Sequence, residues 1–221
     1  MNHYIPSPGN IQKGDFNRVT PFSKEFGYDR GGPVDRYYIE KFLTLNKDLV
    51  FGRTLEIGDN IYSKRFGETR IVKSDILHID SSNKEATIVG DLVNLPQVEH
   101  DTYDCIVLTQ TLHLIYDFTA AIKTCYRILK PGGTLLLTVP GISQIASDQW
   151  QDYWMWSFTQ ASVKKLLGET FGLDHIKTET HGNVLAATAF LYGMGVTELT
   201  EAKLDVNDAN YQVIITAVAT K

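Results

Sequence analysis

Short apolar segments alternate with helical patterns along most of this chain, and this alternation constrains the fold more than any other feature of the sequence. Apolar runs of strand length lie at 54–57, 76–79, 86–89, 105–109 and 134–139, and helical spacing is found at 35–49 and 118–129. Strands that alternate with helices form a mostly parallel sheet, which helices cover on both faces. The pattern therefore predicts an α/β fold.

The last third of the chain continues this pattern. A helix is expected over 159–171, with Thr159 as its N-cap, and a second, apolar helix over 183–192. Strands are expected at 173–180 and 211–219, which brings the total to seven. Apolar and polar residues alternate only weakly in the last predicted strand, so we expect this strand at an edge of the sheet.

The chain divides into a short arm and one domain. Residues 1–21 include a stretch rich in Pro, Gly and Asn that predicts a flexible arm, and 22–221 predicts a single domain. Roughly 200 to 250 residues is a common size for one α/β unit. No internal repeat is visible.

Composition excludes several classes of protein. The formal net charge of −5 and the lack of a basic run argue against nucleic-acid binding, which needs clustered Lys and Arg. No run of about 18 apolar residues and no signal peptide is present, so no membrane association is expected and the cytoplasm is the expected location. The 2 Cys residues lack CxxC spacing, and the few acids after 134–139 give no ligand set, so no metal is expected.

Acidic residues follow three consecutive predicted strands. Glu56 and Asp59 lie at the end of the first, Asp80 follows the second and Asp91 follows the third. The carboxyl ends of parallel strands meet at one edge, where ligands of open α/β sheets bind. Asp80 is placed to accept hydrogen bonds from both hydroxyls of a ribose, although capping of a following helix is its alternative role.

Other residues of this edge suit a cationic nucleoside. Asp91 can accept a hydrogen bond from an adenine amine, Leu92 can contact the base, and Gly58 lets the backbone approach a ligand closely. Asp59 or Glu56 can face a ligand ammonium. The loop lacks the G-x-G-x-x-G pattern, which argues against a nicotinamide cofactor.

These motifs, in this order, carry a family resemblance. They are Glu56-Ile57-Gly58, Asp80, Asp91-Leu92, Tyr103-Asp104 and Leu129-Lys130-Pro131-Gly132-Gly133. From about Asp35 to the C-terminus the chain resembles class I S-adenosylmethionine-dependent methyltransferases. The resemblance implies a Rossmann-like, seven-stranded, mostly parallel sheet with an antiparallel last strand, and S-adenosylmethionine as the cofactor. The expected cofactor-binding residues are Arg36, Tyr38, Glu56, Gly58, Asp59, Asp80, Ser81, Asp91, Leu92, Thr109 and Gln110.

Arg36 has two open interpretations. It can pair with the carboxylate of the cofactor, with Tyr38 closing over the same end, or it can form a surface ion pair with Glu40 four residues on. The segments 30–38, 108–113 and 152–154, the last followed by 158–159, are similar to those of bacterial methyltransferase domains that are fused to, or encoded with, glycosyltransferases. This finer resemblance implies a sugar or glycan acceptor and work alongside a glycosyltransferase.

Aromatic residues gather after the fifth predicted strand, where Trp150, Tyr153 and Trp154 lie within five positions. Their rings can stack on the apolar face of a pyranose and so bind the acceptor. The alternative is a lid whose rings pack on the helix expected at 159–171. Both interpretations stay open, and each can hold for different rings.

His113 follows the fourth predicted strand and is the preferred general base for an acceptor hydroxyl. A structural role in its loop is the alternative. Asp152 is a second catalytic candidate, and His181 is a weaker one. Three functions are therefore compared: an O-methyltransferase acting on a saccharide, a small-molecule N-methyltransferase, and a non-catalytic binding module whose glycine-poor first loop has lost the cofactor.

Overall fold

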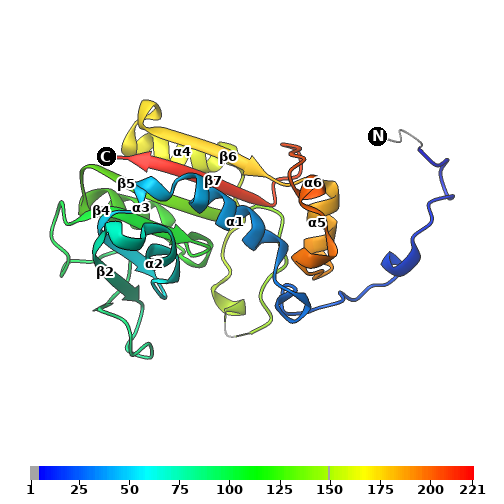
Figure 1. Ribbon diagram of the computed structural model, residues 1–221, viewed down its shortest axis with the longest axis horizontal. Helices are drawn as coiled ribbons and strands as arrows, with labels where there is room; N and C mark the ends of the chain where they lie inside the picture. The colour runs from blue at the N-terminus through cyan, green and yellow to red at the C-terminus, as the bar shows by residue number, and fades with distance from the viewer. Residues whose placement is uncertain (1–4, 149) are drawn as a thin grey trace.

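A computed structural model describes residues 5–148 and 150–221, and a seven-stranded sheet forms its centre (Figure 1). In spatial order the strands are β3 (Ile88–Val89), β2 (Ile71–His78), β1 (Gly52–Ile57), β4 (Tyr103–Thr109), β5 (Leu129–Pro140), β7 (Ile214–Thr220) and β6 (Ile176–His181). β7 is antiparallel to both neighbours, whereas the other pairs are parallel. The predicted Rossmann-like α/β fold with an antiparallel last strand is confirmed.

Helices cover both faces of the sheet, as the alternation predicts. One face packs against α1 (Val34–Leu45), α2 (Ile61–Gly67), α5 (Val184–Leu191) and α6 (Glu201–Leu204), and the other against α3 (Phe118–Ile128) and α4 (Gln160–Phe171). Successive residues of β4 alternate between the two cores, with Cys105 and Val107 in the first and Ile106 and Leu108 in the second. This two-residue period explains why the strand is apolar throughout.

Three details differ from the expectations. The edge position expected for the last strand is wrong, because β7 lies between β5 and β6 and most of its residues are buried. Its alternation is weak because both faces are covered. Helices α2 and α6 were not expected, since they are short and their charged residues hide any helical period. Thr159 caps α4 as predicted, and its side chain accepts from the amide of Ser162.

The N-terminal strap, residues 22–33, leads into α1. Its backbone is held to the segment after α5, where Phe22 N donates to Tyr192 O at 2.7 Å and Val196 N donates to Gly32 O at 2.7 Å. Figure 1 shows the chain before the strap running outward past α5. Tyr192 Oη donates to Phe16 O at 2.9 Å, and residues 1–4 of the expected arm lie outside the described part. In that described part no helix is long and apolar enough to cross a membrane.

Candidate active site at the carboxyl edge of the sheet

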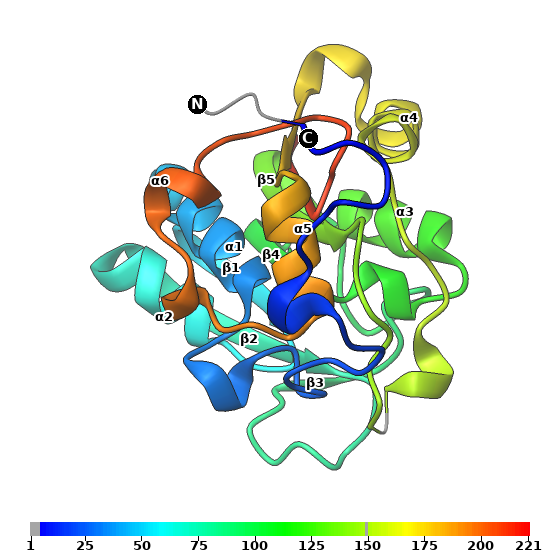
Figure 2. The same ribbon diagram turned by 90° about the vertical axis from the view of Figure 1, so that its right-hand side faces the viewer.

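The carboxyl ends of the parallel strands meet at the edge seen in Figure 2. Strand register fixes this meeting, because Ile57 of β1 lies opposite Leu77 of β2, and Thr109 of β4 lies opposite Thr138 of β5. The loops that follow these strands therefore start side by side. They carry most of the residues expected to bind the cofactor or the acceptor.

Gly58, directly after β1, adjoins open space at this edge. Its φ is +87°, and a Cβ atom added there would meet no heavy atom within 4 Å. Gly58 N donates to Leu77 O at 2.9 Å, and Asn83 Nδ2 donates to Gly58 O at 2.6 Å. The loop backbone is thus fixed to its neighbours while the outer face of Gly58 stays free for a close ligand.

Glu56 is 2% exposed and supports the start of α2. Its carboxylate accepts from Ser63 N at 2.7 Å and from Tyr62 N at 3.2 Å, at the positive end of the helix. Burial raises the pKa of Glu56 to about 7. The side chain is therefore committed to the helix, and its contact with a ligand ammonium stays a prediction.

Three exposed carboxylates, Asp59, Asp80 and Asp91, share one geometry. In each, Oδ1 accepts from a backbone amide two residues on, at 2.9, 2.8 and 2.9 Å respectively. For the part of the chain that is described, Oδ2 of each has no hydrogen bond. Hydrogen bonding by Ser82 and the nearby His78 hold the pKa of Asp80 below its usual value, so it is ionised. Capping a turn and binding a ribose are therefore compatible roles for Asp80.

Arg36 does not form the surface pair with Glu40, because Glu40 pairs with Arg65 at 2.8 Å instead. The half-buried guanidinium of Arg36 donates to the Tyr28 hydroxyl, with Nε at 3.2 Å and Nη2 at 3.1 Å. No carboxylate oxygen lies within 4.0 Å of it among the described residues. Burial lowers the pKa of Arg36, but the charge of the neighbouring buried Asp35, together with nearby tyrosines, more than offsets this and keeps the pKa above its usual value. A partly buried cation without a direct ion pair is a place for a ligand carboxylate.

The remaining residues that we expected to bind the cofactor do not all lie beside Arg36 and the three exposed carboxylates. Tyr38 does not lie beside the Arg36 guanidinium, because its ring is buried and its hydroxyl donates to Leu204 O at 3.0 Å. Leu92 is also buried, and it packs in the core that α3 covers. Thr109 is the last residue of β4, and Ser81 lies in the turn that follows β2. Gln110 has a φ of +45°, a strained conformation for a residue other than glycine.

His113 is 2% exposed and has an unpaired ring nitrogen. Within the described residues Nδ1 is buried without a hydrogen-bond partner, and burial lowers the pKa of the imidazole to about 4. The ring is therefore neutral near pH 7, the form that accepts a proton. The carbonyl of His113 accepts from Met155 N at 3.0 Å and from Trp156 N at 3.2 Å, which binds the aromatic loop to the end of β4.

The aromatic residues divide between the two roles left open. Trp154 lies 4.3 Å from the His113 ring and stacks on Phe26 of the strap at 6.0 Å, and Trp156 donates to Ile115 O at 3.1 Å. Trp150 and Tyr153 are 38% and 56% exposed, and their rings meet edge to face. Packing therefore holds Trp154 and Trp156, while Trp150 and Tyr153 are free to contact an acceptor.

The weaker catalytic candidates differ in their surroundings. Asp152 is exposed on the short helical turn Gln151–Tyr153. His181 already has contacts within the fold, since its Nε2 lies 3.0 Å from Thr216 Oγ1 and its ring stacks on Tyr38.

The sequence gives no indication that Phe26 and Gln144 lie at this edge. Phe26 is placed by a backbone φ of +57°, and the Gln144 amide is buried without a partner in the described chain.

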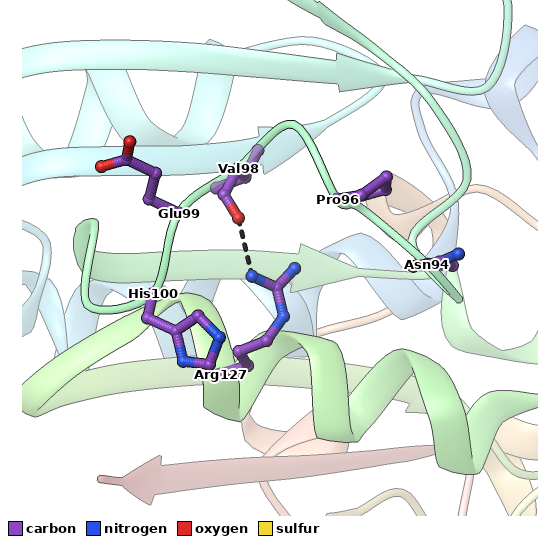
Figure 3. A pocket seen from close by; sticks show the side chains of 6 residues that line it. All are labelled: Asn94, Pro96, Val98, Glu99, His100 and Arg127. Atoms are coloured by element: carbon purple, nitrogen blue, oxygen red, sulfur yellow. Dashed lines mark hydrogen bonds between the residues drawn. The ribbon is translucent and has the colours of Figure 1, made fainter.

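A surface hollow of about 430 Å³ lies away from the predicted site (Figure 3). It is lined by the segment that leads to β4 and by Arg127 of α3, whose Nη1 donates to Val98 O at 2.6 Å. None of the residues predicted from the sequence lines it. Residues 5–148 and 150–221 contain no cluster of three metal-binding side chains.

Comparisons with known proteins identify the family and the fold of the chain. The family model for a methyltransferase domain matches residues 35–182. Probable polyketide synthase 5 of Dictyostelium discoideum is 30% identical over 86 residues, which cover 36% of this chain and only 3% of that protein.

Solved structures share the fold at low identity. The citrinin polyketide synthase CMeT domain has a TM-score of 0.55 at 14% identity, over 85% of this chain and 53% of that one. A SAM-dependent methyltransferase from Archaeoglobus fulgidus has a TM-score of 0.52 at 15% identity, over 85% and 99%.

Proposed function

We propose that this chain methylates a hydroxyl of a sugar or glycan. The premise is that it belongs to the methyltransferase domain family and is an S-adenosylmethionine-dependent enzyme. The single observation that carries this proposal is the pairing, at one sheet edge, of a neutral buried base, His113, with two exposed rings, Trp150 and Tyr153. A glycosyltransferase that makes the acceptor is the partner we propose.

The residues at the edge fit the cofactor. Arg36 has a guanidinium without a carboxylate partner in the described chain, Gly58 leaves open space, and Asp80 and Asp91 each have a free carboxylate oxygen. We propose that Arg36 binds the cofactor carboxylate, Asp80 the ribose and Asp91 the adenine amine. Asp59 adds negative charge near the first loop.

S-adenosylmethionine, when bound, supplies a methyl group on a positively charged sulfur that leaves as a neutral thioether. The chain's own residues must orient the acceptor oxygen and take its proton. His113 is neutral at physiological pH, so its ring nitrogen is available to accept that proton as the new bond forms. Trp154 covers the imidazole and keeps water from it, because the two rings are 4.3 Å apart.

The acceptor class is supported by the exposed rings. Trp150 and Tyr153 present flat apolar faces beside the acidic side chains of Asp148 and Asp152, which can accept hydrogen bonds from hydroxyls. A pyranose offers both an apolar face and a ring of hydroxyls. This combination favours a saccharide over a purely apolar acceptor.

A second candidate is methylation of a polyketide-type acceptor. The similarity to a polyketide synthase of Dictyostelium discoideum and to a citrinin polyketide synthase domain favours it. A neutral base such as His113 suits removal of a proton from an acidic carbon as well as from a hydroxyl.

One screen tests these candidates together. Purified protein is incubated with S-adenosylmethionine and with panels of methyl glycosides, nucleotide sugars, amines and β-ketoacyl thioesters, and release of S-adenosylhomocysteine is measured. We expect turnover with a saccharide panel and little with the others. Turnover confined to amines or thioesters overturns the saccharide proposal. Calorimetry with S-adenosylhomocysteine distinguishes a methyltransferase from a non-catalytic module. A module that has lost the cofactor site would give no heat with about 1 mM of this compound.

A further inference from the structure

The loop after β5 carries a polar side chain whose purpose the fold does not explain. Its backbone is firmly held, because Gly141 N donates to Val213 O at 3.0 Å and Ile142 N donates to Gln212 O at 2.8 Å. A Cβ atom on Gly141 would lie 2.2 Å from Gln212 O, so the loop fits closely against the chain that enters β7. Gln144 follows on this fixed backbone.

The amide of Gln144 is buried without a partner. No atom of the described residues accepts a hydrogen bond from its Nε2. Gln160, a partly buried glutamine of α4, behaves in the ordinary way and donates to Thr178 O at 2.9 Å. Leaving a buried donor unpaired is costly, so a group from outside the chain is expected to accept from Gln144.

A second unpaired atom lies on the neighbouring loop. β4 and β5 are paired up to Thr109 and Thr138, so the loops that carry His113 and Gln144 leave the sheet side by side. His113 Nδ1 is also buried without a partner in the described residues. We propose that Gln144 and His113 together select the acceptor: Gln144 Nε2 donates to its hydroxyl oxygen, and His113 Nδ1 accepts from its hydrogen. This inference rests on the proposed function.

The pair distinguishes hydroxyls from other nucleophiles. A hydroxyl oxygen has two lone pairs, so one can accept from Gln144 while the other attacks carbon. A neutral amine has a single lone pair, which the bond to Gln144 would occupy. A carbonyl accepts from Gln144 but leaves His113 Nδ1 unpaired. Of these three groups, only a hydroxyl satisfies both side chains and keeps an electron pair free for the reaction.

The test compares Gln144→Met with the matched variant Gln160→Met. Each removes one amide from a partly buried side chain of nearly the same shape. The probes are the acceptor that the wild-type protein methylates best in the screen and its analogue that lacks the methylated hydroxyl. Binding to protein saturated with S-adenosylhomocysteine is measured by calorimetry, and thermal unfolding is measured in parallel.

We expect Gln144→Met to weaken binding of the parent acceptor about tenfold and to leave binding of the deoxy analogue unchanged. Its melting temperature should stay the same or rise, because an unpaired donor is removed, whereas Gln160→Met should unfold at a lower temperature and bind the acceptor normally. Unchanged binding of a hydroxyl acceptor by Gln144→Met, or an equal loss for the analogue, overturns the inference alone. A best acceptor that is an amine or a carbon acid instead overturns the proposed function.

Discussion

Two buried titratable groups at the site give opposite pH dependences to stability. The pKa of Glu56 rises from 4.5 to about 7, so the free energy of unfolding falls as the pH rises through this interval. The pKa of His113 falls from 6.5 to about 4, so the free energy of unfolding rises with pH over that interval. Between pH 4.5 and 6.5 the slopes of these two groups oppose each other, and burial also raises the pKa of Asp35 and lowers that of His181, which adds a further pair of opposite slopes to the wild-type profile.

Substitution of either residue exposes the slope of the other. Each slope is about 1.4 kcal/mol per pH unit, so the change between pH 4.5 and 6.5 amounts to about 3 kcal/mol. Glu56→Gln keeps a carbonyl oxygen for the amides of α2, and its free energy of unfolding should rise with pH over this range. His113→Phe keeps a ring under Trp154, and its free energy of unfolding should fall.

Urea unfolding at half-unit steps of pH measures both effects. Glu169→Gln is the control, because it removes an exposed carboxylate from α4 and should leave the wild-type profile unchanged. If Glu56→Gln and His113→Phe each keep the wild-type slope, then burial does not shift the two pKa values and the argument fails.

Three further predictions concern cofactor binding, acceptor binding and folding stability. Arg36→Met should weaken S-adenosylhomocysteine binding tenfold to about 100-fold in calorimetry, while Glu40→Gln should not; equal affinities would exclude Arg36 from the carboxylate. Asp80→Asn should weaken binding by about 1.5 to 3 kcal/mol, and full affinity would refute its ribose role. Trp154→Ala should cost about 3 kcal/mol of folding stability, whereas Trp150→Ala should fold normally and raise the acceptor KM; the reverse result would contradict the packing described here.

The alternation of strands and helices predicts a mostly parallel sheet because a parallel sheet covered on both faces needs apolar strands throughout. Residue alternation misplaces β7. An inner strand that is covered on both faces shows the same weak alternation of apolar and polar residues that we expected of an edge strand. The acids after β1, β2 and β3 could be found because strand ends have fixed positions in the sequence. The contacts of Glu40 with Arg65 and of Tyr38 with Leu204 could not, because they depend on helix α2 and helix α6, which have no clear signal.

Charge is divided along the carboxyl edge in a way that suits the reaction. The loops after β1, β2 and β3 expose Asp59, Asp80 and Asp91, while the unpaired buried groups after β4 and β5 are the uncharged His113 and Gln144. Methyl transfer from a cationic sulfur removes a positive charge, so a carboxylate beside the reacting atoms would stabilise the ground state more than the transition state. Acids that bind the far end of the cofactor add affinity without this penalty. Uncharged groups beside the acceptor can orient a hydroxyl and take its proton while the positive charge disappears.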